Sequence, residues 1–137
     1  MIDDAHALEL FRFADSVQSV TLRVACDAPM VAGEERYYAA EIVLESGFVS
    51  GTVGLHISGG DLDAWGRCLD ALDAEEGAEW PPGGRSAWLS VVPEDPMEVT
   101  VHDSPSTQIA VQVPVDVAPG WLEENRLRLE HVRKAVA

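Results

Sequence analysis

The sequence predicts an α+β fold in which an antiparallel β-sheet of about seven strands, arranged like a meander, packs against two helices. Short apolar segments with period-two alternation are separated by links too short for crossover helices. One amphipathic helical stretch follows the fourth of these segments, where it would pack on the sheet, and a second ends the chain. Because 137 residues is the size of one domain, residues 1–137 are expected to form a single domain.

Residues 7–13 and 17–26 are expected to form the first two strands. The second of them alternates cleanly between an apolar and a polar face. In the first, the two phenylalanines fall on the opposite face from the two leucines, so the alternation is imperfect. Residues 27–35 contain Pro29, Gly33 and paired acids, which predict a loop.

The clearest structural signal is a predicted hairpin. Its strands, at residues 36–45 and 48–57, alternate between aliphatic and polar side chains. Residues 46–47 are expected to make a two-residue turn, in which glycine accepts the positive φ angle. The face of the first strand that carries Glu41 and Glu45 is expected to point outward.

The hairpin leads into a helix that is expected to begin near residue 61 and to end at Gly77. One apolar stripe runs along it, made by Leu62, Trp65, Leu69 and Leu72. We expect this stripe to lie on the inner face of the hairpin, with Trp65 at the centre of the core. The outward acids of this helix are Asp63, Asp70 and Asp73.

The second half of the chain predicts strands and a final helix. Two prolines and two glycines indicate a loop over residues 78–85. Pro114 cannot donate to a strand ladder, so the last strand is expected either at an edge of the sheet or to pair only over its first half. A C-terminal helix is expected to start at Trp121, with an acidic first turn and a basic last turn. The expected strands are residues 86–92, 97–101 and 108–116.

The charge of the chain is far from neutral. There are 24 acidic and 9 basic residues, a net charge of −15, and residues 117–137 carry four of the bases. Such a field repels phosphate backbones and anionic lipid, and it attracts cationic molecules. Nucleic acid and membranes are therefore not expected as partners, whereas a cationic protein is. The acidic N-terminal segment does not resemble a signal peptide, which favours a cytoplasmic protein.

Neither a metal nor another cofactor is predicted. Cys26 and Cys68 are the only cysteines, and they form no CxxC pair. The histidines lie far apart in the sequence, and none is paired with another ligand at helical or hairpin spacing. They are His6, His56, His102 and His131.

The densest group of reactive side chains is His102, Asp103 and Ser104. A hydrolytic relay needs a serine, a histidine within hydrogen-bond reach and an acid that orients the histidine. Neighbours along an extended backbone point to different sides, so these three residues are weak candidates. A polar turn is the expected structure here, and a small hydrolase or transferase that uses the His102–Ser106 loop is the alternative function.

The four tryptophans divide between core and surface candidates. Trp65 is expected in the core. Trp80 precedes two prolines and Trp88 lies in a predicted strand. Both are binding candidates, because tryptophan often anchors protein interfaces, and core packing is the alternative for each. The loops at residues 80–88 and 102–108 are better candidates for a functional surface than any catalytic cleft.

Three segments together resemble a family of small actinobacterial proteins of unknown function. They are YYAAEIVLESGFVSGTVGLHIS at residues 37–58, DLDAWGRCLDAL at 61–72 and VTVHDSPSTQIAVQVPVD at 99–116. The order of strands, tryptophan-containing helix, aromatic-proline loop and further strands is also similar to small immunity proteins. Those proteins neutralise cell-wall-associated polymorphic toxins, so this resemblance implies a protein partner.

The sequence thus favours a non-enzymatic protein-binding module, with an immunity-type inhibitor of a basic toxin as its most specific form. A structural or regulatory subunit, held by a sheet edge, is a further alternative. The chain is expected to be a monomer or a homodimer. The expected protein-binding residues are Glu41, Glu45, Asp63, Asp70, Asp73, Trp80 and Trp88.

Overall fold

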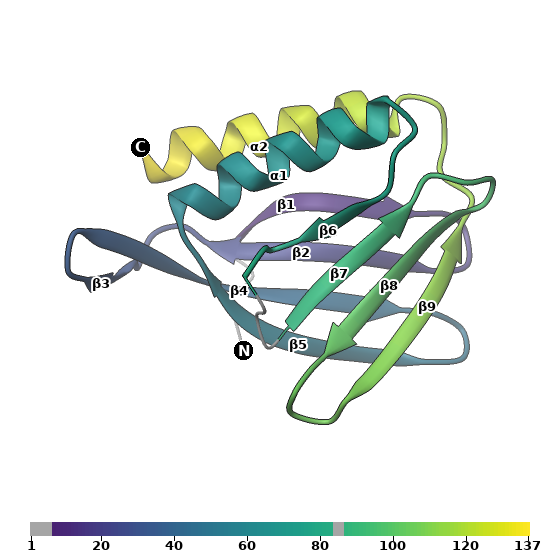
Figure 1. The fold of residues 1–137 in the computed structure, drawn as a ribbon, viewed down its shortest axis with the longest axis horizontal. Helices are drawn as coiled ribbons and strands as arrows, with labels where there is room; N and C mark the ends of the chain where they lie inside the picture. Colours follow the sequence, from purple (N-terminus) through teal and green to yellow (C-terminus); the bar gives the residue numbers. More distant parts are fainter. Residues whose placement is uncertain (1–6, 84–86) are drawn as a thin grey trace.

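A computed structural model describes residues 7–83 and 87–137 of the chain. Within these residues, nine strands form two antiparallel sheets and two helices complete the fold (Figure 1). The α+β class with antiparallel strands is therefore confirmed. The strands belong to two sheets instead of one, and two of them were not expected from the sequence.

The first sheet holds five strands, in the order β1-β2-β4-β3, with β5 also paired to β4. These strands are β1 (Ala7–Ala14), β2 (Ser19–Ala25), β3 (Met30–Ala32), β4 (Glu35–Glu45) and β5 (Ser50–Ile57). The loop expected at residues 27–35 contains β3, because Gly33, with a φ of 65°, allows the chain to turn back onto β4.

The turn between β4 and β5 also differs from the expectation. Glu45 and Ser50 form the last pair of this ladder, so residues 46–49 make a four-residue turn. The Ser46 hydroxyl oxygen organises it by accepting the backbone N–H of Phe48 at 3.0 Å.

A β-bulge explains the irregular pattern of the first strand. The register of β1 against β2 shifts between Glu9 and Phe11, which leaves Leu10 as an extra residue. As a result, Leu10 and Phe11 are neighbours in sequence and yet both are fully buried.

The second sheet holds four strands in the order β6-β7-β8-β9. They are β6 (Ala78–Trp80), β7 (Ala87–Val92), β8 (Met97–Asp103) and β9 (Ile109–Val115). The sequence predicts a loop over residues 78–85, but its first three residues form β6. The prolines begin only after Trp80 and leave these residues free to pair with β7. Pro114 lies on β9, an edge strand, as predicted.

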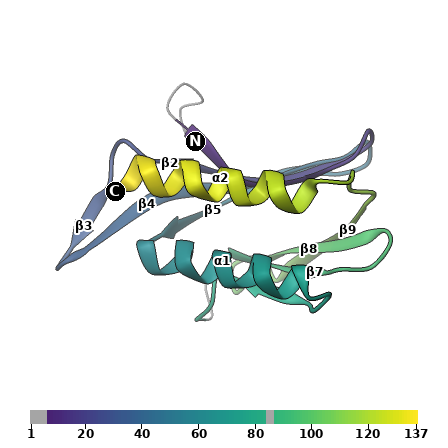
Figure 2. The same cartoon turned by 90° about the horizontal axis from the view of Figure 1, so that it is seen from above.

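The helices α1 (Gly59–Asp73) and α2 (Trp121–Val136) run antiparallel and side by side (Figures 1 and 2). Helix α2 covers β1, and α1 contacts β6 and α2. A side chain at Gly66 of α1 would place its Cβ 3.2 Å from the Arg133 guanidinium and 3.6 Å from Leu129. Glycine at this position therefore permits the close approach of the helices.

Asn125 joins α2 to the backbone of β1. Its side chain is fully buried. The amide oxygen accepts the backbone N–H of Arg12 at 2.9 Å, and the amide nitrogen donates to the Arg12 carbonyl at 3.3 Å. The side chain thereby takes the place of a neighbouring strand at this edge of the sheet.

An aromatic cluster lies where the two sheets and the helices meet. Trp65 from α1 lies 4.7 Å from Phe11 of β1 and 5.7 Å from Trp80 of β6, measured between ring centroids. Phe13 packs edge-on against Trp65 at 6.3 Å. Trp80 also donates its indole N–H to the carbonyl of Asp61, at 2.7 Å. The cluster confirms that Trp65 is a core residue.

Replacement of Trp65 by alanine should lower the free energy of unfolding by about 3–5 kcal/mol, because the change opens a large cavity in the cluster. The Trp65 indole N–H makes no hydrogen bond within the described residues, so Trp65→Phe should cost less. Urea denaturation of both variants measures these losses. A loss below about 1 kcal/mol for Trp65→Ala would show that the cluster does not stabilise the fold.

Candidate functional site

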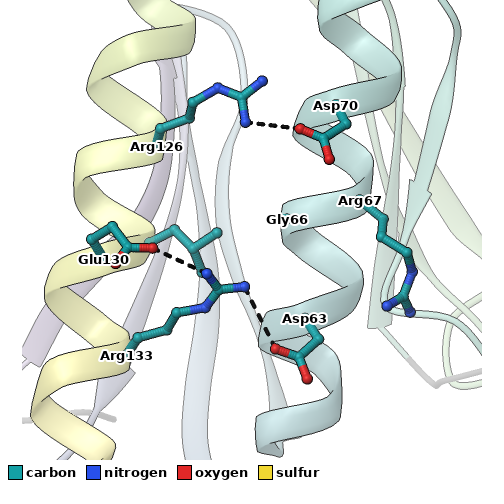
Figure 3. Close-up of a pocket in the computed structure, with 8 residues that line it drawn as sticks. Asp63, Gly66, Arg67, Asp70, Arg126, Glu130 and Arg133 are labelled. Carbon is teal, nitrogen blue, oxygen red and sulfur yellow. Dashed lines mark hydrogen bonds and ion pairs between the residues drawn. The ribbon is translucent and has the colours of Figure 1, made fainter.

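The acids of α1 do not form a free surface, because arginines of α2 pair with them. Asp70 accepts a hydrogen bond from Arg126 at 2.9 Å, and Asp73 lies 3.7 Å from the same guanidinium. Asp63 lies 3.5 Å from Arg133, which also binds Glu130 at 3.0 Å (Figure 3). The helices are thus joined by two groups of ion pairs.

A groove of about 420 Å³ separates these ion pairs. Figure 3 shows the Arg67 side chain of α1 pointing away from α2, so it takes no part in them. Because the paired side chains are exposed, each pair adds little stability and mainly neutralises charge. Asp63, Asp70 and Asp73, which the sequence places among the binding residues, are therefore partly neutralised within the protein.

The other predicted binding residues, on the first sheet and in the core, differ in how accessible they are to a partner. Glu41 is only 7% exposed and lies 3.3 Å from the Arg23 guanidinium. Glu45 is exposed at the end of β4. Trp80 is completely buried in the aromatic cluster, so its expected place in a surface loop is corrected and its indole is closed to a partner.

Trp88 lies at the end of the second sheet, where two connections approach each other. The segment after β6 and the turn after β8 enclose a pocket of about 650 Å³ beside its indole. We call it the Trp88 pocket; its described lining residues are Glu79, Pro81, Pro82, Gly83, Trp88, Ser104 and Pro105. The structure therefore brings together the two loop regions, 80–88 and 102–108, that the sequence identifies as candidates.

The Trp88 indole is held by a ring stack. Trp88 and His102 are cross-strand partners on β7 and β8. Their ring centroids are 3.7 Å apart and their planes differ by 3°. Ser90 Oγ lies 3.2 Å from Nε2 of His102 and fixes the imidazole in place. The result is a rigid aromatic platform beside the pocket.

The three reactive residues identified in the sequence do not form a relay. His102 is bonded to Ser90 and not to Ser104. Asp103 accepts a hydrogen bond from the Thr107 hydroxyl at 2.9 Å, and Ser104 lines the Trp88 pocket. The turn after β8 is thus held by its own polar side chains, as expected for a structural turn.

The electrostatics of the platform favour a neutral histidine. Partial burial lowers the pKa of His102, while the carboxylate of Glu79 opposes this shift. Glu79 is exposed on β6 and is the only charged residue among the described lining residues. At neutral pH the site therefore combines a flat aromatic surface, proline walls and one negative charge.

Several residues that form the Trp88 pocket and its aromatic platform are not among the candidates predicted from the sequence. Ser90 could have been found from the alternation of β7, which places it on the same face as Trp88. Glu79, Pro82 and Pro105 come from separate segments, and only long-range strand pairing brings them together.

No group of three or more His, Cys, Asp or Glu residues in the described part of the chain could hold a metal ion. His6 lies outside the described residues. No helix in residues 7–83 or 87–137 has the length and apolar character needed to cross a membrane.

Comparison with protein families matches residues 8–137 to a family of unknown function, DUF5959. The chain belongs to this family. The match covers almost the whole chain, so the expected membership of a family of unknown function is confirmed. No curated protein and no solved structure matches this DUF5959 member.

The stability of this DUF5959 member should respond to His102. A histidine whose pKa is lowered on folding takes up its proton more readily in the unfolded chain. The contribution of His102 to stability should therefore fall as the pH falls from about 7.5 to 5.5, by less than about 1 kcal/mol.

Urea denaturation of wild type and His102→Gln at both pH values measures this contribution. The variant should lose less stability on acidification, because it lacks the titrating group. An equal or larger loss in the variant would contradict the assigned direction of the shift.

Proposed function

We propose that this protein is a non-enzymatic protein-binding module for a cationic partner, and that one face of the second sheet is its contact surface. We call this the open face. Its residues alternate with the buried residues along β6, β7 and β8 and include Glu79, Trp88, Ser90, Glu98 and His102.

The other side of this sheet is occupied by the core. Leu89, Val91, Val99 and Val101 are at most 8% exposed and belong to the hydrophobic core, where β7 contacts β5 of the first sheet. The four-stranded sheet lies in front of the first sheet in Figure 1, and the view from above shows α2 on the side of the first sheet and α1 level with the second sheet (Figure 2). No described helix or strand covers the open face, which leaves it available to a partner.

The main support for this proposal is the negative charge at one end of this face. Three connections, residues 74–77, 93–96 and 116–120, contain five acids and no lysine or arginine. All three lie at the same end of the second sheet, toward the right in Figure 1. We call these residues the acidic end: Glu75, Glu76, Glu94, Asp95 and Asp116.

Strand register supports this clustering. Ala78 pairs with Val91, so the acids that precede β6 lie near those that follow β7. Met97 pairs with Val115, which places Asp116 beside the same turn. Unlike the acids of α1, those of the acidic end form no ion pair with a described residue. Their field is therefore available to attract a cationic protein and to accelerate its association.

An immunity-type inhibitor is the specific form of this module that we propose. A basic toxin would be steered by the acidic end and would contact Trp88, which is half-buried and rigid. The resemblance to immunity proteins in the order of elements supports the same class. A pull-down at low ionic strength with basic proteins encoded by neighbouring genes tests this form.

Neutralising charge on the open face should weaken such a complex. The double variant Glu94→Gln and Glu98→Gln removes one charge from the acidic end and one from the open face, and it should raise Kd by about tenfold at low salt. The matched control, Glu34→Gln with Glu35→Gln, removes the same charge at the distant β3–β4 turn.

Isothermal titration calorimetry measures the Kd of both double variants for the partner. It is done at about 50 mM and about 300 mM salt, because salt screens the attraction between exposed charges. The control should bind within about twofold of wild type. Equal weakening by the two doubles would show that only net charge matters and that the open face is not the contact surface.

A second candidate function rests on the 3.2 Å contact between Ser90 Oγ and His102 Nε2. A serine bonded to a histidine is the first pair of a hydrolase or transferase site beside the His102–Ser106 loop. A fluorophosphonate probe tests it: covalent labelling of Ser90, lost in His102→Ala, would support catalysis. An unlabelled protein would leave the binding module as the function of this face.

A further inference from the structure

The Trp88 pocket differs chemically from the rest of the open face. Its flat walls are an indole and three prolines, and Glu79 supplies the one charge among its described lining residues. A cavity of about 650 Å³ is large enough to enclose a long side chain. Pocket and open face are continuous, because Glu79 and Trp88 belong to both.

The aromatic wall is fixed before any ligand arrives. His102 covers one ring face of Trp88 at 3.7 Å, and Ser90 holds the imidazole. A side chain that is already ordered loses little entropy on binding. The imidazole is neutral at pH 7 because burial lowers its pKa, so the platform adds no charge that would repel a cation.

We infer that the Trp88 pocket receives an arginine side chain of the cationic partner, an inference that rests on the proposed function and names the group recognised. A guanidinium is planar, so it can stack on an indole and between proline rings. Its parallel N–H groups can also donate two hydrogen bonds to one carboxylate, here Glu79. A lysine ammonium lacks both the plane and the paired donors.

Tryptophan indole signals in ¹⁵N NMR spectra can test this inference directly. The four tryptophans give four indole signals, and Trp88→Phe assigns the relevant one. The probe is the peptide Ac-Gly-Arg-Gly-Arg-Gly-NH₂, compared with its lysine and citrulline counterparts. The arginine peptide should shift the Trp88 signal to saturation and bind at least about fivefold more tightly than either counterpart. The buried Trp65 and Trp80 signals should not move.

Variants with a matched control locate the charge that is recognised. Glu79→Gln should weaken binding of the arginine peptide by about five- to tenfold. Glu123→Gln removes an equal, exposed charge from the first turn of α2 and should change Kd by less than about twofold. Trp88→Ala should weaken binding more than about tenfold. Unchanged Trp65 and Trp80 signals confirm that each variant is folded.

The chain also has its own arginine near the pocket in sequence, Arg85, which lies outside the described residues. Arg85→Gln should bind the peptide at least as tightly as wild type, because it makes the protein more acidic. Weaker binding by this variant would overturn recognition of a cation by the pocket.

Other outcomes separate this inference from the proposed function. Equal binding of arginine and citrulline peptides, or equal effects of Glu79→Gln and Glu123→Gln, would overturn the arginine site. Salt-dependent binding that Glu94→Gln with Glu98→Gln weakens, without a shift of the Trp88 signal, would overturn the pocket and retain the cationic partner. Absence of binding by any basic peptide or basic protein would overturn both.

Discussion

The fold depends on the aromatic cluster, because it is the point at which all layers contact one another. Phe11 and Phe13 come from the first sheet, Trp80 from the second, and Trp65 from the helix that precedes it. The Trp80 indole also donates a hydrogen bond to the backbone at the start of α1. Large aromatic side chains bury much apolar area, so a few residues hold the sheets and helices together.

This arrangement determines which surfaces can serve a partner. The inner faces of both sheets are used by the core, and the facing sides of α1 and α2 are joined by ion pairs such as Asp70 with Arg126. The outer face of the second sheet keeps its charges and carries a half-buried tryptophan. The core and the interhelical ion pairs thus occupy the other apolar and charged groups, which makes this outer face the surface best suited to a partner.

The sequence predicted the features that arise from local patterns. Helix and strand periodicity, the core position of Trp65 and the edge position of Pro114 are of this kind. It did not predict features that need long-range contact. The burial of Trp80 depends on the pairing of β6 with β7, and the neutralisation of Asp63 depends on an arginine 70 residues away. The Trp88 pocket likewise needs two loops from separate parts of the chain.

Carbodiimide footprinting of carboxylates, read by mass spectrometry with and without a saturating hexa-arginine peptide, tests where a cationic partner binds. The open face predicts that Glu79, Glu94 and Glu98 become protected from modification when the peptide binds. Carboxylates of the interhelical groove and of the β3–β4 turn should react as before, because the peptide does not reach them. Protection of Asp63 and Asp70, with Glu79 and Glu98 unchanged, would place the binding surface on the helices and contradict the account.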